Sequence, residues 1–182
     1  MTDVFLERAF EPPLTVTAIK ALLSDAPACF DRHRVRWLES HLARDGHRMV
    51  CHFLAPDTES ARIALRQAGA DARILWCGTV HDAPALDLPG LTSANVLVER
   101  SFARPVTVEQ IQALEDAAAG CLQSHRVRFV RTYASLDGRR MICLYQAPDA
   151  ESVRLAQHQA GMPLDRVWSF RYFHHCVTAT FS

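Results

Sequence analysis

The sequence lacks the short motifs that identify several large functional classes. It contains no CxxC pair, no phosphate-binding loop and no nucleotide or flavin motif. No Ser-His-Asp order of a known catalytic triad is recognisable. Any chemistry must therefore come from residues that only the fold brings together.

Charge and hydropathy exclude two kinds of partner. The 182 residues carry 20 basic and 20 acidic side chains, without a basic run or aromatic residues interleaved with basic ones. Nucleic acid is therefore not expected as a partner. No apolar run is long enough to span a membrane, and the N-terminus shows no signal peptide. We expect a cytoplasmic protein.

A tandem repeat organises the chain. The pattern R-M-x-C-x-x-x-A-P-D-x-E-S-x-R occurs at 48–62 and again at 140–154. Residues 3–82 align without a gap on 95–174, with 32 identities in 80 positions. We interpret 1–82 and 95–182 as two copies of one domain, joined by a linker at 83–94. Cys29 and Cys51 recur in the second copy on apolar faces, which is typical of buried thiols.

Each copy shows the same order of secondary structure. In the first copy, apolar periodicity predicts strands at 4–10, 35–43, 49–54 and 74–80, and helices at 15–30 and 57–69. Thr107 and Gln110 have the spacing of a capping box, Asp57 and Asp149 are candidate helix caps, and Asp45-Gly46 is typical of a hairpin turn.

The order β-α-β-β-α-β predicts the fold. It is that of the ferredoxin-like unit, a four-stranded antiparallel sheet with both helices on one face. The fold class is then α+β, with two tandem ferredoxin-like units. The other face of each sheet, here called the open face, must be covered. We expect the two open faces to pack together as an internal pseudo-dimer, like a dimeric alpha-beta barrel, in a monomer; exchange of the same surfaces between chains would give a homodimer.

Strand alternation assigns side chains to the two faces of each sheet. Val4 and Leu6 are predicted to face the helices, whereas Cys51 and Phe53 are assigned to the open face and His52 to the helices. The open face of the first copy then gathers Glu7, Trp37, Glu39, His41 and Cys51. That of the second copy gathers Glu99, Phe129, Arg131, Tyr133, Cys143 and Tyr145.

These open-face residues allow three interpretations. Carboxylate, imidazole and thiol groups suit nickel or zinc, and the candidate ligands are Glu7, Glu39, His41 and Cys51. The same surfaces could instead be plain packing faces, because no local ligand motif accompanies them. A third possibility is a cleft for a small organic ligand, with Glu7 or Glu99 as general base; its candidate lining is Glu7, Glu99, Trp37, Arg131, Tyr133 and Tyr145.

Three other groups of residues are candidate sites. His33 and His125 follow the first helix of each copy, where a cation caps the helix end. Arg36 and Arg128 could bind an anion together with Arg8 and Arg100, although solvated arginines are commoner. The run 174–176, His-His-Cys, would need a turn to bring its side chains to one ion.

A family resemblance rests on residues that recur along both copies. They are Glu7, Arg8, Phe10, Cys29, Trp37, Ser40, Cys51, Ala55, Pro56, Asp57 and Glu59, then Glu99, Arg100, Phe102, Cys121, Cys143, Ala147, Pro148, Asp149, Glu151, Gly161, Pro163, Arg166 and Val167. The pattern resembles a family of small bacterial ferredoxin-like proteins, mostly of unknown function and often labelled nickel-binding. The resemblance implies this fold and a bound metal ion.

The chain departs from the family pattern at its histidines. The family has His and Tyr where the first copy has Glu39 and His41 and the second has Arg131 and Tyr133. The family's helix histidine is replaced by alanine in both copies. Arg131 would repel a cation, so the resemblance implies that any metal binds to the first copy.

Overall fold

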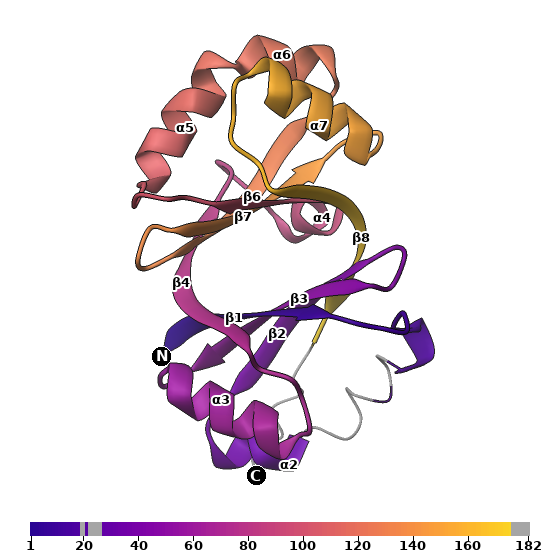
Figure 1. The fold of residues 1–182 in the computed structure, drawn as a ribbon, viewed down its shortest axis with the longest axis vertical. Helices are drawn as coiled ribbons and strands as arrows, with labels where there is room; N and C mark the ends of the chain where they lie inside the picture. Colours follow the sequence, from indigo (N-terminus) through magenta and orange to yellow (C-terminus); the bar gives the residue numbers. More distant parts are fainter. Residues whose placement is uncertain (19–20, 22–26, 176–182) are drawn as a thin grey trace. The chain divides into compact units, whose positions relative to one another are not determined.

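The computed structural model describes residues 1–18, 21 and 27–175, which form two compact units (Figure 1). Unit 1 comprises residues 1–78 together with the chain from 171 onwards, and unit 2 comprises residues 79–170. The strands β4 (Ile74–Asp82) and β8 (Arg166–His174) are each divided between the units. The expected linker carries a short helix, α4 (Leu88–Thr92).

The elements follow the predicted order in both copies. The first copy contains β1 (Thr2–Ala9), α2 (Pro27–Arg32), β2 (Arg36–Ala43), β3 (Arg48–Ala55), α3 (Thr58–Gln67) and β4. The second contains β5 (Val96–Ser101), α5 (Val108–Ala117), α6 (Ala119–Ser124), β6 (Arg128–Ser135), β7 (Arg140–Gln146), α7 (Ala150–Gln159) and β8. Part of the helix predicted at 15–30 lies outside the described residues.

Each unit contains an antiparallel sheet. In unit 1 the strands neighbour one another in the order β4, β1, β3 and β2; in unit 2 the order is β8, β5, β7 and β6. Helices α2 and α3 lie on one face of the first sheet, and α5, α6 and α7 lie on one face of the second (Figure 1). The α+β class and the antiparallel strands are thus confirmed, while the internal pseudo-dimer stays a prediction. In the described part of the chain no helix is both long and apolar enough to cross a membrane.

Local sequence signals explain where the helices begin. The side chains of Asp57 and Asp149 each accept a hydrogen bond of 2.7 Å from the backbone N–H three residues later. Thr107 and Gln110 form the reciprocal bonds of a capping box. Such bonds satisfy N–H groups that have no partner within the helix. The predicted caps are confirmed.

The hairpin glycine of each copy has a left-handed backbone conformation and lies close to a carbonyl oxygen of another segment. Gly46 and Gly138 have φ of +78° and +67°. A Cβ at these positions would lie 2.6 Å from the carbonyl oxygen of Leu14 and 2.8 Å from that of Val106, respectively. Only glycine meets both the left-handed conformation and the close approach without strain.

Each unit has an apolar core between its sheet and its helices. In unit 1, Val4, Leu6, Cys51 and Phe53 belong to the same buried cluster as Leu65 of α3. In unit 2 the equivalent sheet positions include Cys143 and Tyr145. The core therefore identifies the helix-facing side of each sheet.

The face assignment predicted for β3 is wrong. Cys51 and Phe53 face the helices, and His52 lies on the open face. The cross-strand register explains the error, because Val4 pairs with Phe53 and Phe5 pairs with His52. Directly opposed residues point to the same face, so the correct assignment of Val4 fixes that of Phe53. The same correction applies to Cys143 and Tyr145.

The assignment of Trp37 to the open face is also wrong, for a different reason. The pairing of β2 with β3 shifts between Trp37 and Glu39, where a β-bulge interrupts the alternation. An extra residue in one strand reverses the faces that follow it. Trp37 therefore packs against the helix-side core, whereas Glu39 lies on the open face. A bulge at the equivalent place in β6 sends Phe129 to the helix side as well.

Candidate functional site

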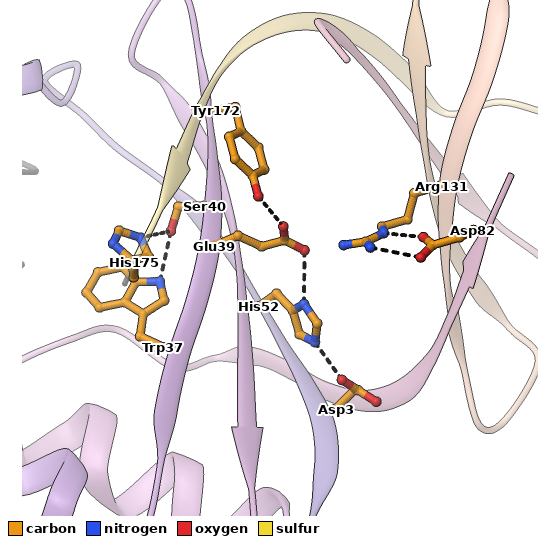
Figure 2. A network of polar contacts seen from close by, with 9 residues as sticks. All are labelled: Asp3, Trp37, Glu39, Ser40, His52, Asp82, Arg131, Tyr172 and His175. Carbon is orange, nitrogen blue, oxygen red and sulfur yellow. Dashed lines mark hydrogen bonds and ion pairs between the residues drawn. The ribbon is translucent and has the colours of Figure 1, made fainter. Parts of the chain in front are cut away.

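A chain of four polar side chains lies on the open face of unit 1 (Figure 2). Asp3 Oδ1 is 2.7 Å from His52 Nε2, and Glu39 Oε1 is 3.1 Å from His52 Nδ1. The Tyr172 hydroxyl donates a 2.8 Å hydrogen bond to Glu39 Oε2. Both nitrogens of His52 thus face a carboxylate, and Glu39 links the imidazole to the phenol.

Strand pairing brings these side chains together. Glu39 of β2 pairs with His52 of β3, and His52 pairs with Phe5 of β1. Asp3 comes from the beginning of β1, and Tyr172 comes from the part of β8 that belongs to unit 1. Four strands therefore contribute to the site, so its geometry depends on the sheet as a whole.

Aromatic rings pack beside the polar chain. The Phe5 ring stacks on that of His52 with centroids 4.7 Å apart and a 21° interplanar angle. The Trp76 ring lies 4.5 Å from that of Phe5, and the His41 ring lies 5.6 Å from that of Tyr172. The side chains of His52 and Glu39 are only 5% and 4% exposed. Their interaction is therefore little screened by solvent.

The carboxylates favour the charged form of His52. Burial lowers the pKa of His52, but the hydrogen bonds and negative charges of Asp3 and Glu39 outweigh burial, and its pKa lies above the usual value. The imidazolium can donate one N–H to each carboxylate.

A second polar cluster lies on the helix-facing side of the same strands, around Ser40 (Figure 2). Trp37 Nε1 donates a 2.9 Å hydrogen bond to Ser40 Oγ, which donates to Cys51 Sγ at 3.2 Å. His175 Nε2 lies 3.2 Å from the same oxygen. Burial lowers the pKa of His175 to about 4, so this imidazole is neutral near pH 7. The cluster holds the end of β8 against β2.

The predicted metal ligands do not converge on one point. Burial raises the pKa of the Cys51 thiol to about 12, and Cys51 lies across the sheet from Glu39 and His41. Glu7 and His41 pair with Val50 from opposite sides, which places their strands about 10 Å apart. Among residues 1–18, 21 and 27–175, no group of three or more His, Cys, Asp or Glu side chains could hold a metal ion.

The two candidate general bases have equivalent surroundings. Glu7 accepts a 2.8 Å hydrogen bond from the indole N–H of Trp76, and Glu99 accepts one of the same length from Trp168. Glu99 also forms a 2.9 Å ion pair with Arg166. Their role as bases stays a prediction.

The other predicted ligand-binding residues are divided between the two faces of the sheets. In unit 2, Arg131 forms a two-bond ion pair with Asp82, with distances of 2.5 and 3.0 Å (Figure 2), and Tyr133 is fully buried. Trp37 and Tyr145 face the helices, contrary to prediction. A ligand on an open face could not contact them.

Sequence reasoning missed three of the four residues of the polar chain. Strand alternation places His52 on the wrong face, and neither Asp3 nor Tyr172 belongs to a predicted site. Tyr172 lies 133 positions after Glu39 and beyond the aligned part of the first copy. A usable signal lay in the alternation of β1 and β3. Pairing Val4 with Phe53 places His52 opposite Phe5, and therefore on the open face.

Comparison with known proteins gives one family and several similar folds. Residues 97–169 match the family model described as nickel responsive protein SCO4226-like, which confirms the resemblance in the second copy. No curated protein matches the chain. The crystal structure of SCO4226 from Streptomyces coelicolor A3(2) is 22% identical, covers 41% of this chain and 91% of its own, and has a TM-score of 0.37.

Two longer similarities extend over nearly the whole chain. A putative chlorite dismutase, TA0507, is 10% identical with a TM-score of 0.53, over 96% of this chain and 95% of its own. An anthrone oxidase-like protein is 12% identical with a TM-score of 0.47, over 99% and 97%. At this level of identity the likeness to TA0507 is one of fold alone.

Proposed function

We propose that this protein binds a divalent transition metal ion of the nickel type on the open face of unit 1, through Glu39 and His52. The match of residues 97–169 to a nickel-responsive family supports a metal-related role. The separation of 3.1 Å between His52 Nδ1 and Glu39 Oε1 carries the choice of residues.

That separation suits two neighbouring ligands of one ion. Metal bonds to imidazole nitrogen and carboxylate oxygen are about 2.1 Å long, so two bonds at a right angle span about 3.0 Å. Nickel in square-planar or octahedral sites has such right angles. An ion bonded to both atoms would lie beside the line that joins Nδ1 and Oε1, so both side chains would turn toward the ion as it displaces the proton.

The neighbouring residues would orient both ligands. The proton on Nε2 would be donated to Asp3 Oδ1, 2.7 Å away, which leaves Nδ1 unprotonated for the metal. Metal-bound histidines commonly donate their other N–H to a carboxylate in this way. Tyr172 holds the second oxygen of Glu39.

Two protein ligands imply modest affinity, with water completing the coordination. Binding is confined to unit 1, because the second copy has Arg131 and Leu144 at the equivalent positions. Of the predicted ligands this assignment retains Glu39, leaves out Glu7, His41 and Cys51, and adds His52.

Calorimetric titration with nickel and with zinc tests the proposal. We expect a dissociation constant below about 100 μM at pH 8, or at least 5.5 kcal/mol. Because the ion displaces a proton, affinity should fall between pH 8 and pH 6. His52→Leu and Glu39→Gln should each abolish binding, and His33→Gln, at the surface, should leave it unchanged.

A further variant separates this site from surface chelation. If His174→Ala removes binding while His52→Leu retains it, the ion is held by the end of β8 and the proposal is wrong. Failure to bind either metal more tightly than about 100 μM would also reject it.

A further inference from the structure

A groove lies on the helix-bearing side of unit 2, apart from the polar chain. Its volume is about 520 Å³, within the range of small-molecule sites. Ala119, Leu122 and Gln123 of α6 form one side, and residues 126–129 form the other. Leu122 and Val127 are buried, and Phe129 is half-buried. The floor of the groove is therefore apolar.

The equivalent residues of the first copy have larger rings. Phe30 stands in place of Leu122, and Trp37 in place of Phe129. Phe30 and Trp37 pack edge to face with centroids 6.1 Å apart, and Trp37 is 5.4 Å from Phe53. Leucine and phenylalanine are smaller, so they leave space that the first copy fills with its own side chains.

The rim of the groove is cationic. Arg126 and Arg128 are both exposed. Within the described part of the chain Arg126 makes no ion pair, and the side-chain contact of Arg128 is a 3.5 Å hydrogen bond to Ser93. Gln123 replaces Asp31 of the first copy, which removes a negative charge from this rim.

Arg126 also occupies a conformation that would suit glycine better. Its φ is +56°, in the left-handed region, which L side chains adopt at a cost in strain. Replacement of Arg126 by glycine therefore removes a rim charge without threatening the fold, and so provides a useful test.

We infer that this groove binds a small apolar carboxylate, of the class that includes medium-chain fatty acids. The apolar floor would bury the chain, and the two guanidinium groups would pair with the carboxylate. Arginine favours this partner, because its planar fork of N–H donors matches the two carboxylate oxygens. A ligand with one carboxylate and an apolar chain matches both the cationic rim and the apolar floor, whereas an uncharged or a fully polar ligand matches only one of them.

Calorimetry with decanoate, below its micelle concentration, is the direct test. We expect saturable binding to the intact chain. Arg126→Gly combined with Arg128→Ser should weaken it about tenfold or more, since a charge-assisted bond contributes on this scale. Leu122→Phe combined with Phe129→Trp, which restores the rings of the first copy, should abolish it.

Matched controls make each outcome informative. Arg34→Gly with Arg36→Ser changes the equivalent residues of the first copy and should leave decanoate binding unchanged. Decanol should bind more weakly than decanoate, with an affinity that does not depend on Arg126 or Arg128. Wild-type decanoate affinity in the Arg126→Gly, Arg128→Ser variant overturns the inference, as does no binding at about 1 mM decanoate. Circular dichroism checks that each variant is folded.

Discussion

At one pair of equivalent positions, 52–53 and 144–145, the two copies bury a polar side chain on opposite faces of their sheets. In unit 1 the polar chain of Glu39 and His52 lies on the open face, and the helix-facing side at the neighbouring position holds Phe53. In unit 2 the open face has Leu144 in place of His52, while the helix-facing side has Tyr145 in place of Phe53. The histidine of one copy and the tyrosine of the other thus have no polar equivalents.

Unit 2 provides its buried tyrosine with polar partners of its own. Arg100, 1% exposed, donates to the Tyr145 hydroxyl at 3.0 Å and to Gln157 Oε1 at 2.8 Å. Tyr145 donates to the carboxylate of Glu115. Burial raises the pKa of Glu115, and the hydrogen bond from Tyr145 and the charge of Arg100 oppose this shift without cancelling it.

The matching arginine of the first copy has different neighbours. Leu65 replaces Gln157, and Arg8 lies over the ring of Phe10, 4.7 Å from its centroid. Buried polar residues thus differ between the two copies as whole groups of partners. A buried polar side chain without its partners destabilises the folded state more than an apolar side chain in the same place.

The largest expected loss of stability follows replacement of Arg100, and replacement of the equivalent Arg8 should cost much less. Arg100→Met would leave Glu115, Tyr145 and Gln157 buried without their cation, and we expect the free energy of unfolding to fall by about 3–5 kcal/mol. Arg8→Met should lower it by about 1 kcal/mol or less, since a cation–π contact is weak. Urea denaturation measures both, and equal losses would refute the contrast.

His52→Leu tests the polar chain of unit 1 by introducing the residue of the second copy. Asp3 and Glu39 would lose the cation between them, with an expected loss of about 3 kcal/mol at pH 6. The folded pKa of His52 lies above its unfolded value of about 6.5, so its stabilising effect is full below that pH and is lost as pH rises through the folded pKa.

The difference in unfolding free energy between wild type and His52→Leu should therefore shrink from pH 6 to pH 9. His33→Gln provides the control, because the His33 imidazole bonds to Gln67 at the surface, and it should change stability by about 0.5 kcal/mol or less at either pH. A difference that grows with pH would show that His52 is neutral in the folded protein.

The smallest expected difference in stability is between variants that remove the hydroxyl groups of Ser40 and Thr132, which lie beside the buried cysteines. Ser40→Ala would remove the acceptor of the Trp37 indole N–H and the hydrogen-bond partner of His175 Nε2, at a cost of about 2 kcal/mol. Thr132→Val removes only the 3.2 Å bond to Cys143, at a cost of about 1 kcal/mol. Thermal unfolding of the two variants should rank them in this order, and the reverse order would contradict the role of His175.

Much of the fold could be predicted because its signals are local. The caps at Asp57 and Thr107 and the glycine at 46 each depend on residues within a few positions of one another, and the ungapped repeat is visible in the sequence without knowledge of any contact. The candidate site could be predicted only in part. Glu39 was placed on the correct face, whereas Trp37 and His52 were not, because alternation cannot reveal a bulge or fix a register between distant strands.

The sequence by itself determined the duplication, the order of the elements and the residue types available in each copy. Only the tertiary structure decided which of them meet. Asp3, His52 and Tyr172 come from three strands that are far apart in the chain, and their contacts depend on pairing across the whole sheet. The charge of His52 follows from that pairing, because the carboxylates that raise its pKa are not its neighbours in sequence.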